Sequence, residues 1–132
     1  MKIPEKVKDI FNNEPVHQFA TASKDGLPNI SNVGAKYLLD EETIIIVDNY
    51  MVKTILNIHE NPEAAILVRR GRESYQIKGR CFYLTSGPIY EEAKKWMKAI
   101  GEKYPAKGAL QIKIEAIYNS NGGSGAGEKV EE

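Results

Sequence analysis

The sequence predicts a mainly β protein, a six-stranded antiparallel β-barrel with one leading helix and two inserted helices. Six short segments have alternating or continuous apolar patterns, which are typical of strands. Turn signals separate neighbouring segments, and the clearest of them, Asp25-Gly26, favours a hairpin. Helical patterns occur at only two places between the strands, whereas a parallel sheet needs a helix after almost every strand.

The first half of the chain predicts one helix and three strands. Residues 3–13 predict the leading helix, because a proline suits its first turn and apolar residues recur on one face. Residues 15–23 alternate in hydropathy and predict the first strand. Residues 27–39 predict the second strand, broken near Gly34. Residues 43–49 are apolar on both faces, so we expect this third strand to be central in the sheet.

The second half predicts two helices and three strands. Residues 49–62 predict a helix that ends at Asn61-Pro62, because the residue before a proline disfavours helical backbone. Residues 88–104 carry an apolar stripe at helical spacing and predict the last helix. The remaining strands are expected in residues 63–71, 74–86 and 107–119.

The length of 132 residues predicts one domain, residues 1–119, followed by a flexible glycine- and serine-rich tail, residues 120–132. Lys plus Arg equals Asp plus Glu at 18 each, so no strong field indicates nucleic acid or an anionic membrane as a partner. No apolar run approaches the ~20 residues that a membrane-spanning helix needs. Composition therefore predicts a soluble protein that acts on, or carries, something small.

The reactive side chains predict no catalytic or metal site. A single cysteine, Cys81, excludes an internal disulfide and favours a cytoplasmic location. One cysteine and two histidines do not favour a structural zinc site. We expect His17 and His59 to be packed or half-exposed rather than to act as a base or a ligand. The arginine cluster in residues 69–72 is more typical of a solvated strand edge than of an anion site.

Lys53 and Thr54, where the helix in residues 49–62 begins, are the candidate site that the residues themselves indicate. A helix N-terminus exposes unpaired N–H groups and a partial positive charge, which attract phosphate. A lysine and a hydroxyl would add a charge and a donor. The alternative is an ordinary first-turn threonine beside a surface lysine. A lysine is unfavourable at a helix start without an anion, and this favours bound phosphate.

Three stretches in the same order carry a family resemblance. They are PNISNVGAKYLLDEE (28–42), IIIVDNYMVKTILNIHENP (44–62) and YQIKGR (75–80). Together they resemble the pyridoxamine 5'-phosphate oxidase-like split-barrel family, which includes small FMN-binding proteins. The resemblance covers roughly residues 5–118. It implies an FMN-binding split β-barrel and a homodimer whose cofactor sites lie between the subunits.

The resemblance also implies which residues bind the cofactor. Lys53 and Thr54 would hold the FMN phosphate. The other implied positions are Ser31, Asn32, Val33 and Gly34 along the ribityl chain and ring, Lys36 near the flavin, Val47 and Asp48 before the turn, and Gln76 across the dimer interface.

The chain also departs from the oxidases. Ser31 stands where they have a phosphate-binding arginine, and Val52 stands where they have a second basic residue. The motif MVKT (51–54) instead resembles the Met-x-Lys-Thr pattern of the small FMN-binding proteins. The oxidases' C-terminal segment has no counterpart, so pyridoxamine phosphate oxidase activity is not expected.

We therefore expect an FMN-dependent oxidoreductase or electron-transfer protein in which the flavin supplies the chemistry and no side chain is assigned as a catalytic acid or base. Its partner would be a small-molecule or redox-protein electron donor or acceptor. Two alternatives remain open. One is a split barrel that binds F420, whose polyanionic tail would call for more basic residues. The other is a non-enzymatic module that binds or stores flavin.

Overall fold

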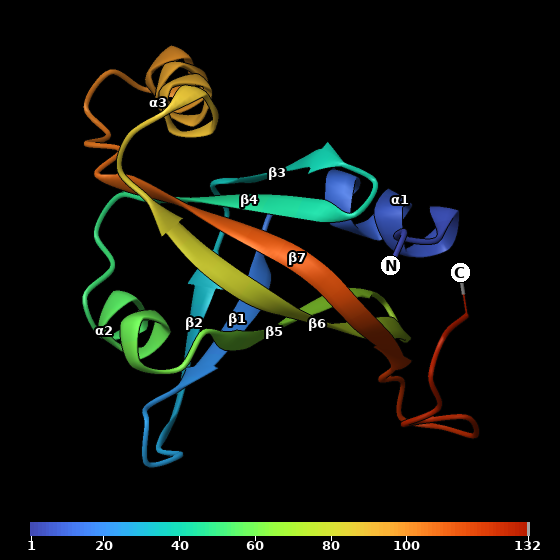
Figure 1. Cartoon of the computed structure of the whole chain (residues 1–132). Helices are drawn as coiled ribbons and strands as arrows, with labels where there is room; N and C mark the ends of the chain where they lie inside the picture. The colour runs from blue at the N-terminus through green and yellow to red at the C-terminus, as the bar shows by residue number, and fades with distance from the viewer. Residues whose placement is uncertain (132) are drawn as a thin grey trace.

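The computed structural model describes residues 1–131, and its single antiparallel sheet confirms the mainly β prediction (Figure 1). Within those residues the sheet has seven strands in the order β2-β1-β5-β6-β7-β4-β3. The strands are β1 (His17–Ala22), β2 (Pro28–Val33), β3 (Lys36–Asp40), β4 (Thr43–Asp48), β5 (Glu63–Arg70), β6 (Glu73–Leu84) and β7 (Gly108–Asn119). The helices are α1 (Glu5–Asn13), α2 (Lys53–Glu60) and α3 (Pro88–Ile100).

The described chain has one strand more than predicted, because the segment predicted as a single strand, residues 27–39, divides at Gly34. Its first half, β2, pairs with β1, and its second half, β3, pairs with β4. At the break the chain passes so close to its neighbour that a β-carbon on Gly34 would lie 3.3 Å from the Pro15 carbonyl oxygen. The hydropathy pattern located this break, but only the strand pairing shows that the two halves belong to different neighbours.

The sheet must close on itself, because its first and last strands are joined by only Gly34 and Ala35. Three residue steps, from Val33 to Lys36, can span at most ~11 Å. The two ends of the strand order therefore lie close together, and the sheet curls into a barrel. The Val47 N–H donates to the Ala35 carbonyl over 2.8 Å and holds the link against β4.

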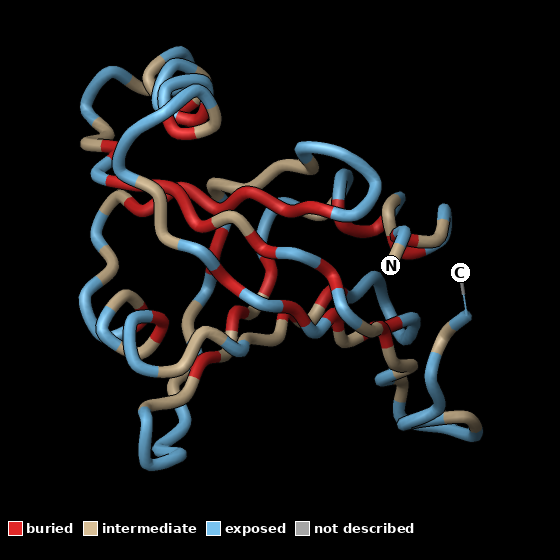
Figure 2. The backbone as a smooth tube through the Cα atoms, viewed as in Figure 1, coloured by how far each residue is buried: buried red, intermediate tan, exposed pale blue. Residues whose placement is uncertain are grey.

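Two apolar clusters fill the molecule. The first lies within the barrel, where α1 buries Val7, Ile10 and Phe11. The second lies outside β4, where Ile45 and Val47 pack against α3. Figure 2 shows β4 buried along its whole length, as expected from a strand that is apolar on both faces. However, β4 is not central in the sheet, because it is second from one end of the strand order. Its outer face is buried because α3 covers it.

The segment after β7, predicted as a flexible tail, turns back along that strand. The Gly127 N–H donates to the Asn119 carbonyl, and the Val130 N–H donates to the Ile117 carbonyl, each over 2.8 Å. The last residue of the predicted tail, 132, lies outside the described residues. The mobility of residues 120–132 stays a prediction. None of the three described helices is long and apolar enough to cross a membrane.

Candidate functional site

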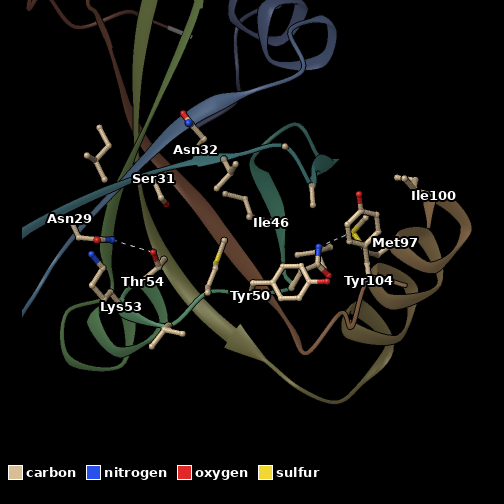
Figure 3. Close-up of a pocket in the computed structure, with 18 of the residues that line it drawn as sticks. Asn29, Ser31, Asn32, Ile46, Tyr50, Lys53, Thr54, Met97, Ile100 and Tyr104 are labelled. Carbon is tan, nitrogen blue, oxygen red and sulfur yellow. Dashed lines mark hydrogen bonds between the residues drawn. The ribbon is translucent and has the colours of Figure 1, made fainter. Parts of the chain in front are cut away.

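A cavity of about 740 Å³ lies between β2, the turn that precedes α2, and α3 (Figure 3). This volume is within the ~300–1,000 Å³ that is typical of sites for cofactors and other small ligands. Three segments form its wall, namely residues 29–35, most of residues 46–54, and part of residues 96–104. Among the described residues that line it, only Lys53 carries a charge. A ligand would therefore meet one positive end and a largely uncharged body.

The charged end is the start of α2. The residue before the helix, Val52, provides no side-chain cap, and the first turn contains no acidic residue. The first amides of the helix therefore keep unsatisfied N–H groups and the positive end of the helix dipole. In the described part of the chain, the Lys53 ammonium group has no ion-pair or hydrogen-bond partner. The start of α2 thus offers donors and positive charge that no side chain of the described chain neutralises.

The Thr54 hydroxyl is held in place by a small amide network. Asn29 donates through Nδ2 to the Thr54 Oγ1 over 3.2 Å (Figure 3). It also donates to the Thr21 Oγ1 over 3.1 Å. Asn57 of α2 also donates to the Thr21 Oγ1, over 3.1 Å. Because Thr54 accepts a bond from Asn29, its own hydroxyl hydrogen is available to a ligand.

Sequence reasoning missed Asn29, which also lines the cavity. Its role depends on the register that places it directly opposite Thr21 in the β1–β2 hairpin. The Asp25-Gly26 turn signal predicts the hairpin, but it does not predict that a side chain of β2 will reach α2. No local pattern in the sequence would have identified Asn29.

The other end of the cavity is apolar. Trp96, Met97 and Ile100 of α3 line it, together with Tyr104 and Tyr50. Figure 3 shows Met97, Tyr104 and Tyr50 at the opposite end of the cavity from Lys53 and Thr54. The apolar stripe predicted the helix α3 but not a role in a site. The edge of the stripe beyond the buried residues faces the cavity.

Seven of the ten predicted cofactor residues line this cavity. They are Ser31, Asn32, Val33, Gly34, Val47, Lys53 and Thr54. The other three, Lys36, Asp48 and Gln76, do not line it. The colinear stretches of sequence thus come together at one place, although three of the side chains point elsewhere.

Each of the three outlying residues has other neighbours. Lys36 donates through Nζ to the carbonyls of Phe11 and Glu14, and burial lowers its pKa. Asp48 is buried behind the turn that leads to α2. Gln76, implied to act across a dimer interface, lines a separate cavity of about 340 Å³ next to the segment that follows β7.

The histidines, the cysteine and the arginine cluster lie away from the main cavity. His17 is buried, with Nε2 3.0 Å from the Phe11 carbonyl, and burial lowers its pKa. Burial raises the pKa of the Cys81 thiol to about 12. Arg70 forms an ion pair with Asp9 over 2.7 Å. Within residues 1–131, no group of three or more His, Cys, Asp or Glu side chains could hold a metal ion.

Comparisons with known proteins identify relatives of this chain. The family model described as pyridoxamine 5'-phosphate oxidase matches residues 3–121. An uncharacterized protein of Methanocaldococcus jannaschii is 38% identical over 133 residues, which cover 98% of this chain and 89% of that protein. The crystal structure of HupZ from Group A Streptococcus is similar with a TM-score of 0.81 and 30% identity, covering 95% of this chain and 99% of HupZ.

Solved structures with different ligands in their names share the fold. An FMN-binding protein from Syntrophomonas wolfei has a TM-score of 0.77 and 20% identity, covering 87% of this chain and 84% of that one. The heme storage protein HutZ from Vibrio cholerae has a TM-score of 0.71 and 13% identity, covering 92% and 98%. An F420 reductase has a TM-score of 0.67 and 17% identity, covering 87% and 98%. At these identities the likeness shows the fold alone, so the ligand must be argued from the cavity.

Proposed function

The chain belongs to the pyridoxamine 5'-phosphate oxidase family, and from this premise we propose that it binds FMN in the cavity between β2, the start of α2, and α3. The observation that carries the proposal is that Lys53, at one end of the cavity, is the single charged residue among the described residues that line it. FMN has the same asymmetry, with one phosphate at the end of its ribityl chain and a large planar ring at the other end. The residues present fit the group.

Lys53, the Thr54 hydroxyl and the first amides of α2 would hold the phosphate. These groups supply a charge, a free hydroxyl hydrogen and unsatisfied N–H donors at one point. Phosphate binding would also compensate for the unfavourable interaction of a lysine charge with the positive end of a helix dipole. This match of donors to an anion supports the phosphate position.

The strand β2 would contact the ribityl chain and the ring through Ser31, Asn32, Val33 and Gly34. In the described chain β2 is the first strand of the sheet order and pairs only with β1. Its outer edge therefore has backbone N–H and C=O groups that no other strand of this chain satisfies. Backbone groups of this kind can bind the polar edge of a flavin ring without any special side chain.

We infer that the protein is an oxidoreductase or an electron-transfer protein. When bound, the flavin supplies the electron-transfer chemistry. The chain contributes binding, orientation and exclusion of water, the last through the apolar wall of Trp96, Met97 and Ile100. The electron donor or acceptor would be a small molecule or a redox protein, and we propose a cytoplasmic location.

A second copy of the chain would complete the site. Four cavity-lining residues combine an apolar side chain with high exposure, and their exposed fractions are Ile30 68%, Tyr50 69%, Val52 67% and Ile100 60%. Exposed apolar side chains gathered around one cavity are typical of a surface that another molecule covers. We propose that the covering molecule is a second subunit, which makes a homodimer.

The charge of the cavity favours FMN over F420. The polyanionic tail of F420 calls for several cations, and Lys53 is the single cation among the described lining residues. The arginine cluster in residues 69–72 does not line the cavity, and its Arg70 is already paired with Asp9 and Glu14. Competitive titration with FMN and F420 would separate the two cofactors, and tighter binding of F420 would contradict our assignment.

The decisive experiment is purification without added cofactor, followed by a visible absorption spectrum and mass spectrometry of the released ligand. We expect flavin bands and the mass of FMN, or else stoichiometric binding of added FMN. A colourless protein that does not bind added FMN would contradict the proposal. Anaerobic reduction of the bound flavin and reoxidation by a panel of acceptors would then test turnover. A flavin that exchanges electrons with none of them would indicate a storage module.

A further inference from the structure

A hydrogen-bonded pair, the buried Asp48 and the half-buried Tyr83, lies behind the turn that leads to Lys53. Asp48 is the last residue of β4 and is only 1% exposed. Its Oδ1 accepts the Met51 N–H over 2.9 Å, and its Oδ2 accepts the Tyr83 hydroxyl over 2.6 Å. Met51 is two residues before Lys53. One carboxylate thus connects the backbone of the turn to a side chain of β6.

The position of Tyr83 depends on a missing side chain in the neighbouring strand. Gly108, at the start of β7, pairs directly with Asp48. A β-carbon on Gly108 would overlap the ring of Tyr83, so the tyrosine can cross to Asp48 only because this residue is glycine. The Tyr83 ring also meets the edge of the His59 ring, with centroids 5.6 Å apart, in the last turn of α2. Tyr83 therefore contacts the last residue of β4, from which the turn begins, and the end of α2.

Other bonds hold the same turn against the segment before β7. The Lys107 N–H donates to the Asp48 carbonyl over 2.8 Å, and the Lys107 Nζ lies 3.4 Å from the Met51 carbonyl oxygen. The Ala106 N–H donates to the Asn49 Oδ1 over 3.0 Å. The Lys107 Nζ also lies 3.9 Å from the Asp48 Oδ1. Among these contacts, the bond from the Tyr83 hydroxyl is the one that removal of a single side-chain atom abolishes without removing a charge.

We propose that Tyr83 is a positioning residue for the phosphate end of the cavity. Through Asp48 and the Met51 amide, it would hold the turn so that Lys53 and the first amides of α2 point at the phosphate. The inference rests on the proposed binding of FMN. Without the tyrosine hydroxyl, the buried Asp48 Oδ2 loses its donor, and a buried acceptor without a partner is costly. The carboxylate would then turn to other donors, release the Met51 N–H, and loosen the start of α2.

The test compares the affinities of FMN and riboflavin, which differ only by the phosphate. Their ratio measures the phosphate end separately from the ring. We expect Tyr83→Phe to lower this ratio by about tenfold, the effect expected if the loosened start of α2 loses one charge-assisted hydrogen bond to the phosphate. The affinity for riboflavin should change little. Gly108→Ala displaces the Tyr83 ring rather than removing its hydroxyl, and it should lower the ratio as well. This variant replaces Tyr83→Phe in the test if Tyr83→Phe does not fold.

Tyr75→Phe is the matched control. Its hydroxyl also donates to a carboxylate, that of Glu73, over 2.7 Å, but neither residue lines the main cavity. This variant should keep the wild-type ratio even if its unfolding free energy falls. If Tyr83→Phe is less stable but keeps the wild-type ratio, the pair is only structural and the inference is overturned while FMN binding stands. If the wild-type protein binds neither flavin, the proposed function itself fails.

Discussion

At the scale of single residues, the most informative feature is a charge that the described chain does not compensate. Lys53 lies at the positive end of α2 without an acidic neighbour in the first turn. By contrast, Lys36, Lys107 and Arg70 all contact carboxylates or carbonyls. An unpaired cation at a helix start is a poor arrangement for stability alone. Its position in the cavity wall supports the anionic ligand that we propose.

We expect Lys53→Ala to weaken the binding of FMN by about 1.5–3 kcal/mol, because a charge-assisted hydrogen bond to the phosphate is lost. Binding of riboflavin, which lacks the phosphate, should be nearly unchanged. Both affinities can be measured by quenching of flavin fluorescence. Lys94→Ala is a suitable control, because Lys94 is exposed on α3 and does not line the cavity. Equal affinities of wild type and Lys53→Ala for FMN would remove Lys53 from the site.

Cys81 predicts a pH dependence of stability. Burial, with Glu63 and Glu115 nearby, raises the pKa of its thiol from the ordinary 9.0 to about 12. The folded state therefore keeps the proton more tightly than the unfolded state does, and this stabilisation is complete below the unfolded pKa. We expect it to disappear as the pH rises from about 9 towards 12.

Urea unfolding of the wild type and of Cys81→Ala, at neutral and at alkaline pH, measures this contribution. The variant should be less stable at neutral pH, because it loses buried volume, but its free energy of unfolding should fall less steeply with rising pH. Comparison of the two slopes removes the effect of tyrosines such as Tyr75, whose pKa is also raised. Parallel pH profiles would show that the thiol does not titrate differently in the folded state.

At the scale of elements, the start of α2 and the edge strand β2 each serve two purposes. The chain from β4 leads into the first turn of α2, and the uncapped amides of that turn lie at the cavity. The strand β2 closes one side of the barrel and lines the cavity with residues from Asn29 to Val33. Elements that a rigid sheet holds in place are better supports for a ligand than free loops are.

The uncapped start of α2 makes Val52→Asp informative. A carboxylate there would occupy the donors of the first turn and repel a phosphate, so FMN should bind more weakly by about 1–2 kcal/mol. Riboflavin should be affected much less. The two flavin affinities, measured side by side, test this.

Leu56→Asp on the same helix is the matched control for Val52→Asp. Leu56 is 61% exposed against 67% for Val52, but it does not line the cavity. A similar loss of FMN affinity in both variants would indicate a general effect of negative charge on α2. In that case the start of the helix would have no special role.

At the scale of the whole molecule, the cavity is open on a side that carries exposed apolar residues. Ile30 on β2 and Ile100 at the end of α3 both line it, although they come from distant segments of the chain. Exposure of these apolar side chains to water is unfavourable in free energy, and contact with a second subunit would remove this cost. The same contact would shield the flavin.

We expect the protein to be a dimer in light scattering, and Ile30→Asp to shift it towards monomer. The dimer dissociation constant should rise by at least about tenfold, because an unpaired carboxylate would be buried in the contact. FMN affinity should fall together with the dimer fraction. Leu27→Asp, at a residue that is 73% exposed but does not line the cavity, should leave the dimer intact. A monomeric wild type with full FMN affinity would contradict the proposed subunit contact.

Much of this architecture is predictable from local patterns. Alternation of apolar residues located the strands, Asp25-Gly26 located the hairpin, and Asn61-Pro62 located the end of α2. Hydropathy and turn chemistry act over a few residues, so a short stretch of sequence is enough to recognise them. Local pattern also singled out Lys53 and Thr54, because a helix start and its charges lie within one turn. These predictions needed no knowledge of which strands are neighbours.

Only the tertiary structure decided the rest, because it depends on contacts between distant segments. The division of residues 27–39 into two strands follows from pairing with different partners. Asn29 reaches Thr54 across 25 positions of sequence, and Asp48 meets Tyr83 across 35. Hydropathy does not encode which residues meet when a sheet closes into a barrel. The charged end of the cavity was therefore predictable from one turn of sequence, whereas the rest of its wall depends on the folded chain.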